Sequence, residues 1–171
     1  MARPDTRLSF DTDWKYSPAP EGTDHIRIDP QYELYIGGKF VAPRQRQYFD
    51  TINPACEKPL ARVARADRGD VDRAVAAARR AYERVWSKLK PAERGKYLYR
   101  IARMLQERAR EFAVIESLDG GKPIRESRDI DVPLAAAHFF YYAGWADKLE
   151  YAFPGRRAAP LGVAGQIIPW N

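Results

Sequence analysis

The chain has 171 residues, of which 45% are hydrophobic and 12% aromatic, so it can bury a core and is not a disordered tail. No apolar run approaches the roughly 18 residues that cross a bilayer, and the first residues lack the apolar region of a signal peptide. The net charge of +6 is spread over segments that also carry Asp and Glu, a mixture more typical of solvated helix faces than of nucleic-acid binding.

Residues 1–31 contain four prolines among polar residues and show no sustained periodicity, so we predict an extended or partly disordered leader. Apolar runs then lie on either side of Gly37-Gly38, at Leu34–Ile36 and Lys39–Val41. A Gly-Gly connection tolerates the positive φ of tight hairpin turns, which predicts a β-hairpin. Weak alternation in YFDTINP and clearer alternation in Leu60–Ala66 predict two further strands.

From Asp70 the apolar spacing becomes three and four residues, which is typical of amphipathic helices. We predict a helix to about Val85, with Asp67 or Asp70 as its N-cap. A second helix is predicted to begin at Pro91. A third, short helix is predicted to end at Gly120-Gly121, with Gly120 in the left-handed conformation. A fourth helix is predicted over about 130–150.

After Pro154-Gly155 the pattern returns to that of strands, with candidates at Arg157–Leu161 and Val163–Ile168. The second candidate is nearly continuous in apolar residues, as expected for a parallel strand covered on both faces. Hairpin, strands, helices and a buried strand, in that order, predict an α/β fold.

Few side chains could carry catalysis or bind a metal. Cys56 is the only cysteine and has no identifiable base, so we favour an incidental thiol over a nucleophile, and it fits a reducing, cytoplasmic compartment. His25 and His138 lack ligand spacing, so no metal site is expected. In LDGGKP, residues 118–123, helix termination explains the glycines better than a phosphate loop, whose spacing is missing.

Pro169-Trp170-Asn171 follows the predicted buried strand. Ligands of open α/β sheets gather at the carboxyl ends of parallel strands, and an amide N–H there could stabilise an oxyanion. From these residues alone we favour a strand-ending turn, with an active-site edge as the alternative.

Several motifs taken together resemble the aldehyde dehydrogenase superfamily. They are YIGGKFV, DTINPA, DVDRAVAAARRAY, LDGGKP, YYAGWADK and PLGVAGQIIPWN, in this order and over roughly residues 32–171. The resemblance implies the N-terminal part of that fold: a β-hairpin, helices and the start of a Rossmann-type parallel sheet. About 151–161 would contribute to the oligomerisation arm of a homodimer or homotetramer.

By the same resemblance, Asn171 donates to the oxyanion of a cysteine thiohemiacetal, and Ile167, Ile168, Pro169 and Trp170 line the NAD or NADP cleft. The implied reaction oxidises a small-molecule aldehyde to a carboxylic acid. Some members of the superfamily also hold a monovalent cation through groups that match Thr51, Ile52 and Asp119.

The family's nucleophilic cysteine and glutamate base lie beyond the PWN motif and therefore outside these 171 residues. We expect this portion to be inactive alone, and to self-associate or be partly disordered in isolation. Two alternatives stay open: a CoA-acylating semialdehyde dehydrogenase, and a non-catalytic basic helical module that binds nucleic acid or a protein.

Overall fold

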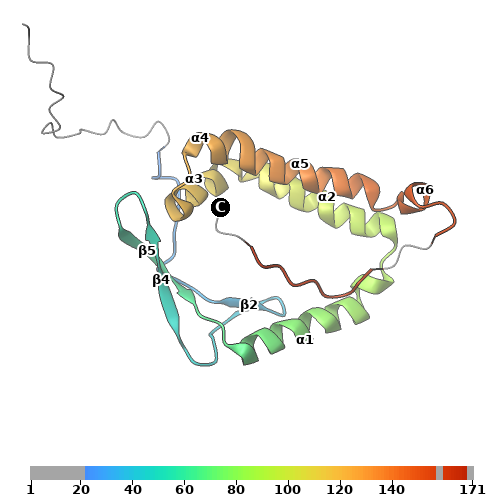
Figure 1. Ribbon diagram of the computed structural model, residues 1–171, viewed down its shortest axis with the longest axis horizontal. Coiled ribbons are helices and arrows are strands. Elements are labelled where there is room, and N and C mark those ends of the chain that lie inside the picture. The colour runs from blue at the N-terminus through green and yellow to red at the C-terminus, as the bar shows by residue number, and fades with distance from the viewer. Residues whose placement is uncertain (1–21, 157–159, 169–171) are drawn as a thin grey trace, which may run out of the picture.

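The computed structural model describes residues 22–156 and 160–168, and it separates a β region from a set of helices (Figure 1). The strands are β1 Gln31–Tyr32, β2 Leu34–Ile36, β3 Lys39–Val41, β4 Tyr48–Asn53 and β5 Lys58–Ala64. The main helices are α1 Arg68–Arg84, α2 Pro91–Glu107, α3 Ala109–Gly120 and α5 Val132–Trp145. Shorter turns complete the set: η1 Trp86–Lys88, α4 Ile124–Glu126, η2 Ser127–Asp131 and α6 Leu149–Ala152. The predicted α/β class is confirmed.

The strands form two small units. In the first, β5 lies between β1, with which it is parallel, and β4, with which it is antiparallel. In the second, β2 and β3 form the predicted antiparallel hairpin, whose turn places Gly37 at φ 64° and Gly38 at φ 83°. These positive values explain why two glycines stand there, because a side chain would strain the turn.

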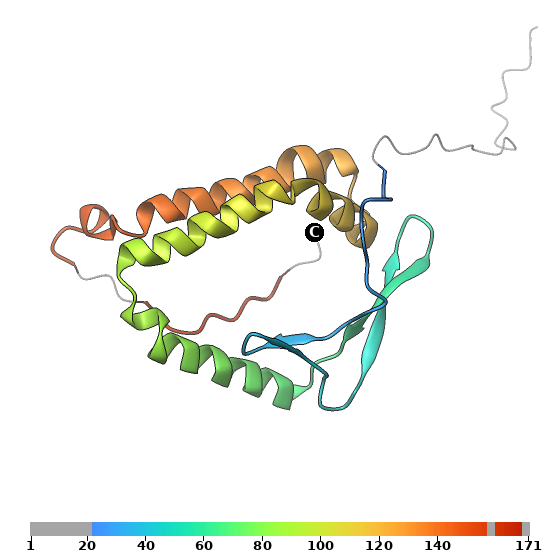
Figure 2. The ribbon, with the colours of Figure 1, turned by 180° about the vertical axis from the view of Figure 1, so that it is seen from behind.

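Helices α2 and α5 lie side by side in both views (Figures 1 and 2). The start of α2 packs closely against the end of α5 at Gly95, which has no side chain. A Cβ at this position would lie 3.0 Å from the carbonyl oxygen of Ala143, which is tighter than an ordinary contact. Ala102 and Ala136 are fully or almost fully buried, and Tyr99 packs edge-on against Phe140 at 5.1 Å between ring centroids. Small residues therefore set the close approach, and aromatic rings pack beside it.

The end of α3 corrects one detail of the prediction. Gly120 is the last helical residue, and Gly121 rather than Gly120 is left-handed, at φ 71°. A Cβ on Gly121 would lie only 2.6 Å from Cγ of Pro54, so this glycine also lets the helix end press against the turn after β4. The helix stop thus ties the helices to the sheet.

The predicted fourth helix is also divided differently. A continuous helical stretch begins earlier, at Ile124, passes through the π turn η2 and ends at Trp145, while α6 is separate. Pro133 lies in the first turn of α5, as predicted, directly after the π turn η2. Ala109 begins α3 and does not extend α2.

The prediction of a strand at Val163–Ile168 is wrong for this structure. Residues 160–168 have no regular secondary structure, and all of them are exposed. A strand needs a hydrogen-bonded neighbour, and no described strand pairs with this segment. Most of the predicted strand Arg157–Leu161, and the leader up to residue 21, lie outside the described residues.

We expect Gly121→Ala to destabilise the chain by about 1 kcal/mol or more, because alanine combines an unfavourable positive φ with a clash against Pro54. Gly120→Ala is the matched control, since only a side-chain oxygen of Glu116 lies near its Cβ position, at 3.7 Å. Thermal unfolding followed by circular dichroism measures both. Equal melting temperatures for the two variants would contradict this account of the α3 end.

Candidate active-site segment

The residues predicted to form the site lie in and just after the segment Gly162–Ile168. Asn171, Pro169 and Trp170 are outside the described residues. Ile167 and Ile168 are described and project into solvent, with 101% and 78% of their surface exposed. The described part of the chain therefore presents two apolar side chains that no other element covers.

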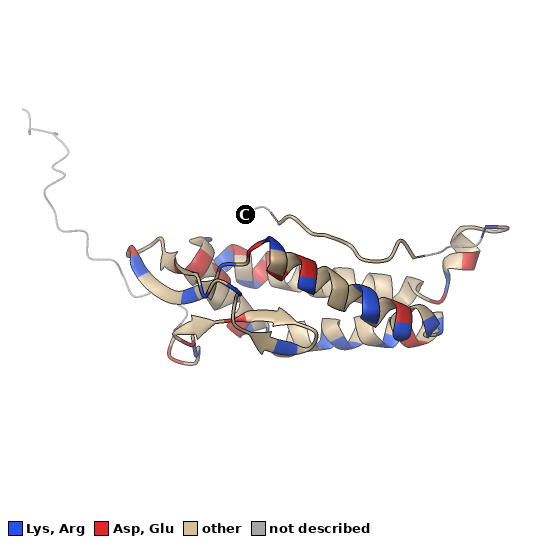
Figure 3. Ribbon diagram, turned by 90° about the horizontal axis from the view of Figure 1, so that it is seen from below, with Lys and Arg blue, Asp and Glu red and all other residues tan. Residues whose placement is uncertain are grey.

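The start of this segment lies beside α1. Gly162, Val163 and Ala164 form one wall of a hollow of about 380 Å³, and the other wall comes from α1 and η1, with Ala78, Ala81, Tyr82 and Trp86. The segment crosses between α1 and the α2–α5 pair only in the projection of Figures 1 and 2, and Figure 3 shows it to one side of the helices. Within the segment, Gly162, Val163 and Ala164 are therefore the residues that border α1 and η1.

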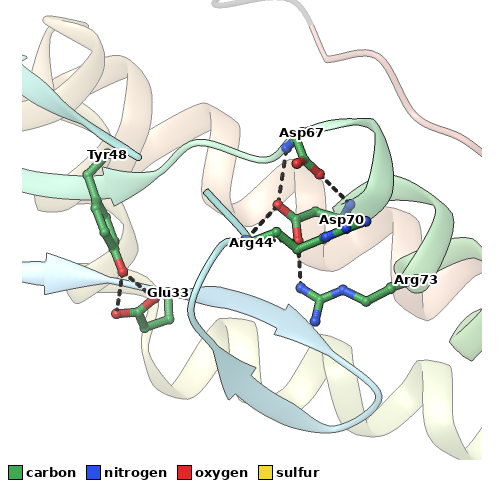
Figure 4. A network of polar contacts seen from close by, with 6 residues as sticks. All are labelled: Glu33, Arg44, Tyr48, Asp67, Asp70 and Arg73. Carbon is green, nitrogen blue, oxygen red and sulfur yellow. Dashed lines mark hydrogen bonds and ion pairs between the residues drawn. The ribbon is translucent and has the colours of Figure 1, made fainter. Parts of the chain in front are cut away.

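A buried carboxylate, Asp70, fixes the start of α1 (Figure 4). It exchanges hydrogen bonds with the N-cap Asp67 in a capping box: the Asp70 N–H donates to Oδ1 of Asp67 at 2.8 Å, and the Asp67 N–H donates to Oδ2 of Asp70 at 3.1 Å. The N–H of Arg44, in the loop after β3, donates to the same carboxylate at 3.2 and 3.3 Å. Arg73, one turn along α1, completes the cluster with an ion pair at 2.5 Å.

These contacts determine the charge state of Asp70. Burial alone would raise its pKa, but the hydrogen bonds from Asp67, Arg73 and Arg44 outweigh that effect and hold the pKa below its ordinary value. One ionised group therefore ties together α1 and the loop that leaves the hairpin. The sequence predicted Asp67 and Asp70 only as alternative N-caps, whereas the structure uses both.

A second polar contact supports the sheet (Figure 4). The Tyr48 hydroxyl, on β4, donates to both carboxylate oxygens of Glu33 at 2.9 and 3.0 Å. Desolvation, with this hydrogen bond to an anion, raises the pKa of Tyr48. The phenol thus stays protonated and keeps its role as a donor at neutral pH.

The LDGGKP turn holds its lysine in an ion pair. Lys122 Nζ lies 2.7 Å from Oδ2 of Asp131 on η2, and this hydrogen bond, with nearby Glu116 and Glu126, raises the pKa of Lys122. The lysine is thereby engaged by carboxylates of its own chain. Asp131 acts through this pair and does not cap a helix N-terminus with its side chain.

Thr51 and Asp119, which are 68 positions apart in the chain, come together in the structure. The Thr51 hydroxyl on β4 donates a hydrogen bond to Oδ1 of Asp119 near the end of α3. Alongside the contact between Gly121 and Pro54, it forms the second link between the sheet and α3.

The remaining candidates for chemistry are isolated from one another. Cys56 is an exposed free thiol in the turn between β4 and β5. His25 and His138 are both exposed, and the described residues contain no group of three or more His, Cys, Asp or Glu side chains arranged to hold a metal ion. No nucleophile–base pair is assembled around Cys56 by the contacts described.

Charges of both signs are mixed along the helices (Figure 3). Several basic side chains pair with acids on the same helix, such as Lys96 with Glu93 and Arg103 with Glu107. Within the described part of the chain, no helix combines the length and apolar character that a membrane span requires.

Comparison with known proteins decides the family. The model of the aldehyde dehydrogenase family matches residues 40–171. This chain belongs to the aldehyde dehydrogenase family. The match covers the hollow beside α1, the ion-paired LDGGKP turn and the whole predicted site, so the resemblance inferred from the motifs is confirmed.

Individual family members show the extent of the likeness. Acetaldehyde dehydrogenase 2 of Cupriavidus necator is 42% identical over 153 residues, which are 82% of this chain and 29% of that protein. An aldehyde dehydrogenase of Bacillus cereus, in an NAD+ complex, superimposes with a TM-score of 0.69 at 37% identity over 71% of this chain and 25% of that one. PnpE, in complex with nicotinamide adenine dinucleotide, superimposes with a TM-score of 0.67 at 46% identity. The superposition covers 69% of this chain and 24% of PnpE. The chain spans about 30% of the length of the curated relatives it matches.

The lowered pKa of Asp70 predicts a pH-dependent loss of stability. An ionised Asp70 contributes stability that is complete above the ordinary aspartate pKa of 3.8 and is lost as the pH falls through the lower pKa of the folded state. We expect Asp70→Asn to lower the melting temperature at pH 7 and the gap from wild type to narrow below about pH 4.

Asp72→Asn serves as the control, because Asp72 is on the same helix and is exposed. It removes the same charge without breaking the cluster, so its melting temperature should stay close to wild type. A gap between Asp70→Asn and wild type that stays constant from pH 7 to pH 3 would contradict the assignment.

Proposed function

We propose that this chain forms part of an NAD(P)-dependent aldehyde dehydrogenase that oxidises an aldehyde to a carboxylic acid. The observation that carries the proposal is the family match, which extends through the complete PWN motif to Asn171. The NAD+ complexes of two structurally similar proteins support the choice of cofactor.

The proposed chemistry starts when a cysteine thiolate, from a part of the enzyme beyond these 171 residues, adds to the aldehyde carbonyl. The carbonyl oxygen of the resulting thiohemiacetal becomes an oxyanion, and the side-chain amide of Asn171 donates a hydrogen bond to it. A donor in this role lowers the barrier by about 3 kcal/mol, because it is placed where charge develops and not where the neutral substrate binds. When bound, NAD(P)+ supplies the acceptor for the hydride, and a glutamate then assists water in hydrolysing the thioester.

Ile167, Ile168, Pro169 and Trp170 would form one wall of the cofactor cleft. The chemistry of the described pair fits that task, since two exposed aliphatic side chains offer a flat apolar surface to a nucleotide. They bring no cation for the pyrophosphate, so these residues fit one wall only, and the opposite wall would come from elsewhere in the enzyme.

The cellular setting and the partners follow from the same proposal. The single, exposed Cys56 suits a reducing cytoplasm, where lone thiols persist. The mixed charges on the helices support a small-molecule substrate and not a nucleic acid, which would favour a concentrated basic surface. We assign the intact enzyme a homodimeric or homotetrameric state, as the resemblance implies.

The 171-residue chain alone should not reduce NAD+ in the presence of an aldehyde, because the only cysteine available to it is Cys56. The measurement is NADH absorbance over time with a set of aliphatic and aromatic aldehydes, with a complete aldehyde dehydrogenase as the positive control. Steady NADH production that disappears in Cys56→Ser would contradict the proposal, since it would make Cys56 the nucleophile.

In the intact enzyme, Asn171→Ala should lower kcat by about 10²–10³-fold with a smaller change in KM, because the lost hydrogen bond forms mainly in the transition state. Steady-state kinetics measure this split. Asn171→Asp is the matched control, because it preserves size but places a negative charge near the oxyanion and should be at least as slow. An Asn171→Ala enzyme with unchanged kcat would remove Asn171 from the proposed mechanism.

A further inference from the structure

The charges along α1 change character in its second half. Residues 79–90 contain five cations and one acid, Glu83. Three of the cations recur at intervals of four residues and run from α1 into η1, namely Arg80, Arg84 and Lys88, which we call the cationic ladder. This stretch is therefore far more basic than the mixed helices around it.

No described residue neutralises the ladder. None of its three side chains makes an ion pair or a hydrogen bond with a described residue, in contrast to Arg73 at the start of α1, which pairs with the buried Asp70. Like charges four residues apart on a helix repel each other, so this spacing lowers the stability of α1. The helix dipole explains a cation in the last turn, which is Arg84, but not Arg80 one turn earlier. The fold of α1 therefore does not require the ladder.

The ladder lies on the face of α1 that points away from its apolar stripe. The stripe contains Val71, Val75 and Ala78, and Ala78 lines the hollow beside α1. At about 100° per residue, Arg80 lies about 180° around the helix from Val71. Burial of the stripe removes apolar surface from water, whereas burial of an unpaired guanidinium costs free energy. Further chain that packs on α1 in the intact enzyme therefore favours the stripe and leaves the ladder at the surface.

We propose that the cationic ladder binds an extended acidic segment of a partner protein, with carboxylates at alternate positions. Arginine donates two parallel N–H···O bonds to a carboxylate, which makes the guanidinium well suited to this anion. Arg80 and Arg84 are about 6 Å apart along the axis of α1, because each residue rises by about 1.5 Å. Alternate side chains of an extended peptide share one face and are about 6.6 Å apart. Alternating carboxylates therefore match the spacing of the ladder.

Acidic side chains on the same helix limit the width of the partner. Asp72 and Glu83 are both exposed, and each lies within about 80° of Arg80 around α1. A bilayer or a nucleic acid would extend across this width, so its phosphates would meet these carboxylates, and like charges repel. A single peptide strand can follow the ladder alone. The neighbouring acids thus favour a narrow acidic peptide as the partner.

Fluorescence anisotropy of labelled peptides, titrated with the intact enzyme, tests the proposal. The probe is a peptide of alternating Glu and Ser, and the comparison peptide has the same composition with its Glu and Ser in separate blocks. At low ionic strength, wild type should bind the alternating peptide at least about threefold more tightly, because only this peptide presents all its carboxylates on one face when extended. Equal affinities, or no binding of either peptide, would overturn the proposal.

The double variant Arg80→Gln with Arg84→Gln should raise the Kd for the alternating peptide by about tenfold or more, because two bidentate contacts are lost. Arg65→Gln with Arg100→Gln is the matched control, since it removes the same charge from two exposed arginines, one after β5 and one on α2. Its Kd should stay within about twofold of wild type. Equal losses in the two double variants would overturn the proposal in favour of attraction by net charge alone.

Charge reversal tests the ladder with a gain of binding, which a folding defect cannot produce. Arg80→Glu with Arg84→Glu should lose the acidic peptide and bind a peptide of alternating Lys and Ser, since the sign is inverted and the spacing is kept. A variant that is folded by circular dichroism but does not bind the Lys peptide would contradict the proposal. Tighter binding of wild type to a DNA oligonucleotide or to phosphatidylserine vesicles than to the acidic peptide would also overturn it, in favour of that other partner.

Discussion

The small size of the buried side chains constrains everything else in this chain. Apart from Pro43, the buried apolar side chains among the described residues belong to alanines and valines: Ala61, Ala64, Ala102, Ala113, Val114, Val132 and Ala136. They allow backbones to approach closely, as where Gly95 of α2 meets Ala143 of α5, but each adds little hydrophobic stabilisation. Larger side chains such as Tyr141, Tyr142 and Ile168 are left substantially exposed. The secondary structure is therefore well formed, while much of the apolar surface has no partner within the chain.

Polar contacts join elements that a larger apolar core would otherwise hold together. The ionised Asp70 joins α1 to the loop after β3, the Thr51–Asp119 hydrogen bond joins β4 to α3, and Lys122–Asp131 joins the α3 end to η2. Directional contacts of this kind fix relative positions, although their net free energy is modest. The Asp70 cluster is the link that fixes the start of α1, the helix that borders residues 162–164.

Local signals in the sequence predicted local structure well. The Gly37-Gly38 hairpin, the capping aspartates and Pro91 at the first turn of α2 each act within a few residues, so their outcome depends little on the rest of the fold. The pairing of Asp131 with Lys122 and the dual use of Asp67 and Asp70 depend on tertiary placement and could not be predicted from spacing. The strand expected at Val163–Ile168 failed for the same reason, because apolar content is local whereas a hydrogen-bonded neighbour is not. The motifs were enough to identify the family. Of the five residues predicted to form the site, the structure describes only Ile167 and Ile168.

We propose that this chain provides one wall of an aldehyde dehydrogenase cofactor cleft and lacks the other. Isothermal titration of the 171-residue chain with NAD+ tests it most directly, because binding requires both walls and no catalytic group. We predict no saturable heat at NAD+ concentrations that saturate a complete aldehyde dehydrogenase run in parallel. Saturable one-site binding to the 171-residue chain would contradict the account, since it would show that these residues form a whole nucleotide site by themselves.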